Sequence, residues 1–77
     1  MKTDAQIQKD VMDELRWTPL LKSSEIGVAV KDGVVTLSGM VNAYSKKMEA
    51  EKAAANVEGV KAVALDIQVG VSSYFKR

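Results

Sequence analysis

The chain has 77 residues, enough for one domain with a modest core, because folding at this length buries only about 60–65% of the surface exposed by the unfolded chain. Eleven basic and ten acidic residues leave a net charge of +1, which argues against strong sequence-independent nucleic-acid binding. The sequence contains neither cysteine nor histidine, so it has no disulfides, no thiol nucleophile and none of the usual zinc ligands. We therefore expect a small domain without a catalytic site, cofactor or metal.

The first predicted helix begins near Asp4. Thr3 and Gln6 have the spacing of a capping box, in which each side chain hydrogen-bonds the backbone N–H of the other residue. Pro19 disfavours helical geometry in the preceding residue, so the helix should end around residue 16 or 17. One apolar stripe recurs every fourth residue and is expected to face the core: Ile7, Val11 and Leu15.

The flank of this helix allows two interpretations. Lys9, Met12 and Arg16 lie beside the apolar stripe, either as a solvated surface or as an interfacial face whose basic side chains surround Met12 near an anionic surface. Trp17, the only tryptophan, either folds back over the edge of the core or stays exposed as a membrane or partner anchor beside Leu20, Leu21 and Lys22. Burial is the commoner outcome for so large a ring.

Two strands follow, at residues 26–31 and 34–41, and they form the centre of the fold. Apolar residues alternate with small or polar residues in both runs, which is typical of strands that have one buried face. Asp32 and Gly33 lie between them, and this pair favours a type I′ hairpin turn with positive φ at both positions. We assign Asp32 and Gly33 a structural role.

Residues 43–57 are predicted to form the second helix, with Asn42 or Ser45 as its N-cap and Gly59 as the glycine after its end. Small residues on one face would let this helix lie close to the sheet. A second apolar line consists of Tyr44, Met48 and Ala55. We favour burial of this line, with the helix seated between the sheet and the first helix, over a surface for a partner.

The third strand is predicted at residues 63–69, again from alternation. A strand–helix–strand connection of this length favours parallel pairing, so this strand should run parallel to one neighbour and antiparallel to the other, with both helices on one sheet face. The fold class is α+β, in the order α-β-β-α-β, with a three-stranded mixed sheet and two helices packed on one face. Residues 1–70 should form the single domain, followed by a tail or linker at 71–77. The expected core comprises Val11, Leu15, Val28, Val35, Leu37, Ala54, Val60 and Ile67.

Three stretches resemble the BON domain, named for bacterial osmotically induced and nodulation proteins. They are D-V-M-D-E-L-R-W-T-P-L-L at residues 10–21, V-K-D-G-V-V-T-L-S-G-M-V at 30–41 and E-A-E-K-A-A-A-N-V-E-G-V-K-A-V at 49–63. The resemblance implies a non-enzymatic module that associates with anionic phospholipid membranes in periplasmic, envelope-attached and osmotic-stress proteins, often as tandem repeats. Its lipid contacts would correspond here to Lys9, Met12, Arg16, Trp17 and Lys22. The two ends of the sequence resemble the first repeat of a multi-BON protein.

A different class of function stays open. The line of Tyr44, Met48 and Ala55, or an exposed strand edge, could dock a protein partner or a neighbouring repeat in a scaffolding role.

The first ten residues are charged and contain no apolar run, so we expect neither a signal peptide nor a spanning segment. The location is then either cytoplasmic or, as the resemblance implies, periplasmic with a signal outside this sequence.

Overall fold

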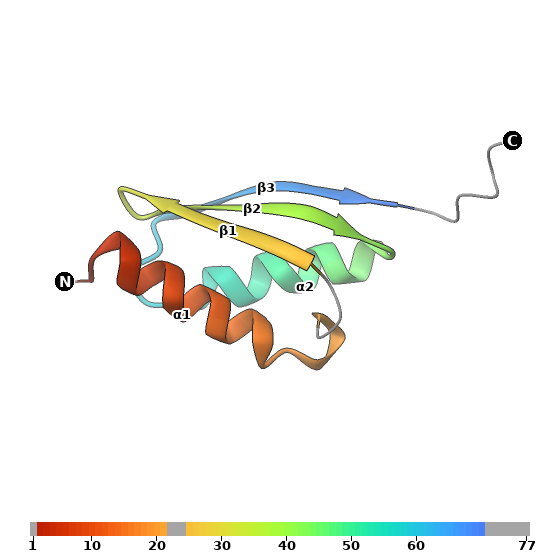
Figure 1. Ribbon diagram of the computed structural model, residues 1–77, viewed down its shortest axis with the longest axis horizontal. Coiled ribbons are helices and arrows are strands. Elements are labelled where there is room, and N and C mark those ends of the chain that lie inside the picture. The colour runs from red at the N-terminus through yellow and green to blue at the C-terminus, as the bar shows by residue number, and fades with distance from the viewer. Residues whose placement is uncertain (1, 22–24, 71–77) are drawn as a thin grey trace, which may run out of the picture.

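The computed structural model describes residues 2–21 and 25–70. Its elements confirm the predicted α+β fold and the order α-β-β-α-β (Figure 1). The tail expected at 71–77 lies outside the described residues. The elements are α1 (Asp4–Arg16), the 3-10 helix η1 (Pro19–Leu21), β1 (Glu25–Lys31), β2 (Val34–Val41), α2 (Tyr44–Ala55) and β3 (Ala62–Val69).

The capping box sets the start of α1. Thr3 is the N-cap, and its Oγ1 accepts from the Gln6 N–H at 3.2 Å while the Gln6 Oε1 accepts from the Thr3 N–H at 2.9 Å. The last residue is Arg16, within the range that Pro19 predicted. Its buried residues are the predicted stripe of Ile7, Val11 and Leu15. Local sequence signals thus determine where α1 begins and ends and which of its faces packs against the sheet.

The hairpin between β1 and β2 turns at Asp32 and Gly33, with φ angles of 52° and 82°. These are the positive values that the Asp-Gly pair predicted. Pairing continues from Lys31 opposite Val34 to Glu25 opposite Met40. The alternation along β2 therefore buries Val35, Leu37 and Val41 on a single face.

The central strand is β2, which pairs antiparallel with β1 and parallel with β3. The sheet is mixed as predicted, but the expectation that the third strand has two neighbours is wrong. The tight hairpin keeps β1 beside β2, and the connection through α2 brings β3 to the other side of β2. Hence β3 lies at an edge with one parallel neighbour.

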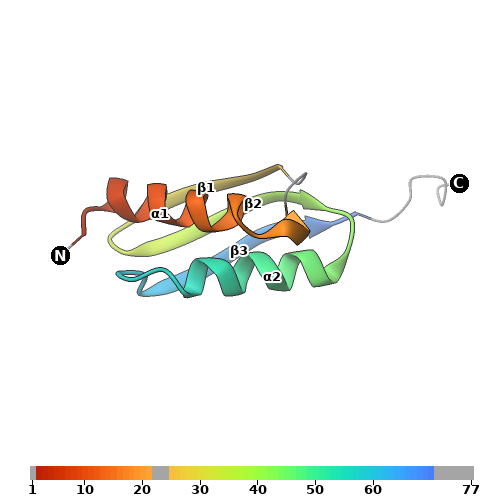
Figure 2. The same ribbon diagram turned by 90° about the horizontal axis from the view of Figure 1, so that it is seen from below.

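Both helices pack side by side on one face of the sheet, which confirms the predicted layering (Figure 2). Val11, Val35 and Leu37 are completely buried between the layers. Val28 and Val60, predicted to be fully buried, are partly buried and pack against this core. The buried apolar residues that form the core are Ile7, Val11, Leu15, Leu21, Val35, Leu37, Val41, Ala50, Ala53, Ala54, Val57 and Ile67.

The ends of α2 differ from the prediction. Its N-cap is Ala43 in extended geometry, without a side-chain cap, so neither Asn42 nor Ser45 has that role. The helix stops at Ala55, two residues early, because the Val57 N–H bonds the Ala54 oxygen at 3.2 Å in a tighter turn. Gly59, with φ of 99°, therefore belongs to the turn before β3 and does not directly follow the helix.

The second apolar line of α2 was also predicted wrongly. Tyr44 is 63% exposed, Ala55 is exposed and Met48 is only partly buried, so the line as a whole is not buried between the sheet and α1. The reason is that α2 lies beside α1, as Figure 2 shows, and its alanine face alone seats it on the sheet. Tyr44 is consequently directed toward solvent.

Candidate functional site

Four of the five predicted lipid-contact residues lie on the exposed side of α1 and at its end. Lys9 and Arg16 expose 78% and 72% of their side chains, and Met12 is 44% exposed. An open depression of about 400 Å³ runs along this side, lined by Ala5, Gln8, Lys9, Met12, Asp13 and Arg16. Lys22, the fifth predicted residue, lies outside the described residues. We refer to Lys9, Met12, Arg16 and Trp17 as the α1 surface.

Asp13 lies between the two basic side chains of the α1 surface. Its carboxylate is 3.4 Å from the Lys9 Nζ and 3.8 Å from an Arg16 guanidinium nitrogen. Such exposed pairs within a helix contribute only a few tenths of a kcal/mol each, roughly. An approaching anion can therefore compete with Asp13 for both cations at small cost.

Trp17 forms the end of α1 and is 81% exposed. The interpretation that it folds back over the core is wrong. Trp17 lies two positions after Leu15, and this spacing turns its side chain away from the buried stripe. The edge of the core is filled instead by Leu21 of η1, which is only 4% exposed and donates its N–H to the Thr18 oxygen at 2.9 Å.

Leu20 is a further apolar residue of this site, expected beside an exposed Trp17 but not among the five predicted lipid contacts. It is 44% exposed in η1, directly before the buried Leu21. The adjacent leucines in Pro19–Leu21 were the available signal, because a short turn can bury one and expose the next. The structure thus groups Leu20 with Trp17 just beyond the end of α1.

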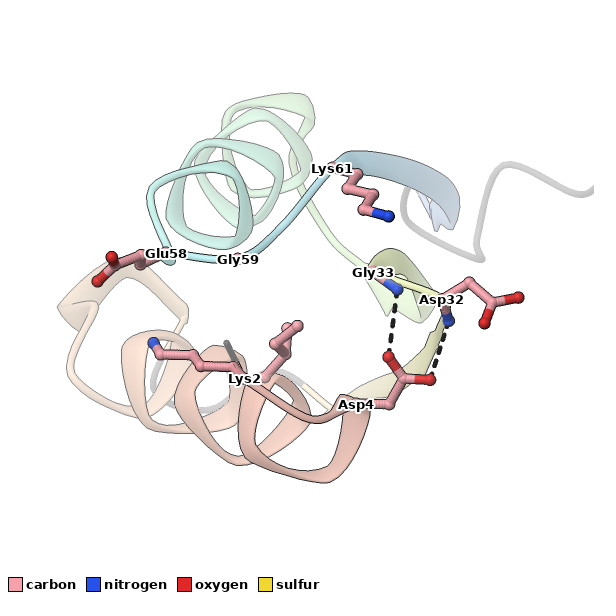
Figure 3. A pocket seen from close by; sticks show the side chains of 8 residues that line it. Lys2, Asp4, Asp32, Gly33, Glu58, Gly59 and Lys61 are labelled. Atoms are coloured by element: carbon pink, nitrogen blue, oxygen red, sulfur yellow. Dashed lines mark hydrogen bonds between the residues drawn. The ribbon is translucent and has the colours of Figure 1, made fainter.

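A second cavity, of about 410 Å³, lies at the hairpin end of the molecule (Figure 3). The Asp4 carboxylate accepts from the Asp32 N–H at 2.9 Å and the Gly33 N–H at 3.2 Å. Figure 3 shows the side chain of Asp32 directed away from this contact. The lining consists of Lys2, Asp4, Ile7, Asp32, Gly33, Glu58, Gly59 and Lys61. Because Asp4 already occupies both donors of the turn, the structural role that we assign to Asp32 and Gly33 accounts for this geometry.

Within residues 2–21 and 25–70, no group of three or more acidic side chains is placed to hold a metal ion. The same residues contain no helix with the length and apolar character needed to cross a bilayer. The surface with the most pronounced features is therefore the α1 surface, where an exposed tryptophan and methionine flank two basic side chains.

Comparison with protein families gives one clear result. The model of the BON domain matches residues 3–71, which is nearly the whole chain. A search of curated proteins found no match.

Proposed function

Because this chain belongs to the BON domain family, a family of non-catalytic binding domains, we propose that it is a binding module for anionic phospholipid membranes. Its contact is the α1 surface, together with Lys22. A place in the bacterial envelope and a part in osmotic stress belong to the same proposal, since both rest on the family.

The observation that carries this proposal is the exposure of Trp17, at 81%. A large ring exposed to water at the end of a helix suits the interfacial region of a bilayer. Tryptophan is enriched there because its ring is amphipathic, with an apolar body and a polar N–H group. Met12 and Leu20 add exposed apolar surface nearby along the chain. Insertion of these side chains would remove that surface from water.

Charge supplies the second part of the attraction. Lys9 and Arg16 have long exposed side chains that can contact lipid phosphates while Met12 enters the interface. A basic residue near an anionic leaflet contributes about 1 kcal/mol, whereas the net charge of +1 gives little long-range attraction. Binding by one domain should therefore be weak and sensitive to salt, and tandem domains would strengthen it through effective concentration.

The test is titration with vesicles of phosphatidylglycerol and, separately, of phosphatidylcholine, following Trp17 fluorescence and co-sedimentation. We expect a blue shift and sedimentation with phosphatidylglycerol only, both weakened by added salt. Lys9→Gln combined with Arg16→Gln should reduce binding by about 30-fold, as about 1 kcal/mol for each charge implies. Trp17→Ser should also weaken binding.

Lys31→Gln combined with Lys61→Gln is the matched control, because it removes two charges at the hairpin end, where Lys31 pairs with Val34 and the Lys61 N–H bonds the Gly33 oxygen. This double variant should bind almost as well as the parent. Absence of binding to either vesicle would refute the proposal. Binding that responds equally to both double variants would show general attraction without a defined α1 surface.

A further inference from the structure

Exposed apolar side chains gather at the end of the molecule opposite the hairpin. Figures 1 and 2 show the last turn of α1, η1, the end of β2 and the start of α2 toward this end. Besides Trp17 and Leu20, it holds Tyr44 in the first turn of α2 and Met40 near the end of β2, each 63% exposed. We call this the apical end and define it as residues 16–21, 25, 40–47 and 68–70.

The apical end is also the more basic part of the molecule. Its described residues carry three positive side chains, Arg16, Lys46 and Lys47, against the single negative side chain of Glu25. This local excess of two positive charges exceeds the net charge of +1 for the whole chain. Within the described part of the chain, neither Lys46 nor Lys47 forms an ion pair.

The position of these lysines does not serve the stability of α2. They lie in its first turn, which has no acidic residue, and positive charge there is mildly unfavourable to the helix dipole. Next to them, Tyr44 exposes a ring with a polar hydroxyl, a side chain that prefers the membrane–water interface. Aromatic and basic side chains thus occur together on α2, as they do at the end of α1.

We propose that the domain meets an anionic phospholipid surface with its apical end, so that Tyr44, Lys46 and Lys47 form a second contact beside Trp17 and Leu20. This inference rests on the proposed membrane association and adds an orientation to it. Two antiparallel helices would then point their adjoining ends at the bilayer. The alternative orientation lays α1 flat on the lipid, with contact through the α1 surface and none through α2.

Backbone amide shifts of the parent protein distinguish these orientations directly. The titration uses bicelles that contain phosphatidylglycerol, with phosphatidylcholine bicelles as the reference. We expect perturbations at residues 44–47 together with the α1 surface and residues 18–21, and none at the hairpin residues 31–34. Perturbations confined to residues 5–17 would overturn the apical orientation and leave membrane association intact. Absence of any perturbation would overturn both.

Charge variants provide an independent measure on phosphatidylglycerol vesicles. Lys46→Gln combined with Lys47→Gln should lower the affinity by about 30-fold, whereas Lys31→Gln combined with Lys61→Gln should lower it less than about twofold. Equal small effects of the two double variants would contradict a contact through α2. Far-ultraviolet circular dichroism checks that both variants keep the fold.

A single tryptophan introduced into α2 would report whether the start of this helix enters the lipid. In a Trp17→Phe background, Tyr44→Trp should give a blue shift with phosphatidylglycerol vesicles, and Val34→Trp at the hairpin end should not. Co-sedimentation of both variants establishes that they are bound. A bound protein with an unshifted Tyr44→Trp emission would refute the proposed contact, and a shift from Val34→Trp alone would place the hairpin end on the lipid.

Discussion

The carboxylate of Asp4 accepts a hydrogen bond from the backbone N–H of Gly33, 29 residues further along the chain, at 3.2 Å. The same carboxylate accepts from the Asp32 N–H at 2.9 Å. Positive φ angles at both turn residues direct successive N–H groups to one side, a geometry that suits an anionic acceptor. The first turn of α1 is thereby joined to the hairpin, so helix and sheet have a polar link in addition to their apolar contacts.

We expect Asp4→Ala to destabilise the domain by about 1–2 kcal/mol. The variant loses two hydrogen bonds to a charged acceptor, leaves the buried Gly33 without its partner and removes a favourable charge at the start of α1. The free energy of unfolding in urea measures the effect.

Asp13→Ala is the matched control, because Asp13 is in the same helix and forms only exposed ion pairs. Its cost should stay below about 0.5 kcal/mol. If the two variants have equal stability, the link between α1 and the hairpin contributes nothing.

Gly39 is expected to tolerate no side chain. Its φ is 137°, and a Cβ would overlap the backbone oxygen of Glu25 on the neighbouring strand. Gly39→Ala should therefore cost about 2 kcal/mol or more, through strain and disrupted pairing of β1 with β2. Thermal unfolding measures the loss.

Gly27→Ala offers the comparison within the same strand pair. The one close approach of a Cβ at Gly27 is to the side-chain oxygen of Ser38 at 3.0 Å, which a change of the serine rotamer relieves, and the Ser38 backbone oxygen at 3.8 Å is an ordinary contact. This variant should stay within about 1 kcal/mol of the parent. A Gly39→Ala protein with parental melting behaviour would refute the close approach of β1.

Leu37 lies at the centre of the core and is completely buried on β2. Leu37→Ala should cost about 2–5 kcal/mol, a large part of the stability of so small a domain. Val34→Ala, on the same strand but 40% exposed, should cost less than about 1 kcal/mol. Urea titrations of the two variants test this contrast, and similar midpoints would contradict the assignment of the two faces of β2.

Much of the fold could be predicted because its signals are local. The capping box at Thr3 and Gln6, the turn at Asp32 and Gly33, and the alternation along β2 each act over a few residues. The partners of β3 could not be predicted in the same way. Which side of the hairpin the third strand joins depends on packing of the whole chain, and no short pattern encodes it.

The candidate site was predictable in part. Helical spacing placed Lys9, Met12 and Arg16 on the exposed side of α1, where the structure has them. The orientation of Trp17 depended on whether another residue filled the edge of the core, and Leu21 does so. Tyr44 was assigned to the interior because its spacing fitted an apolar line, although an alanine face was sufficient to seat α2.

The buried alanines of α2 determine whether contact at one end of the domain can change its other end. Ala50, Ala53 and Ala54 are buried against the sheet, and none of them has a rotamer that could switch between two packings. Long-range coupling through a core requires elements with two discrete arrangements. Contact at one end should therefore leave the other end unchanged, and the domain should behave as a rigid adaptor. Any cooperative response would then arise from the number of such domains held on one surface.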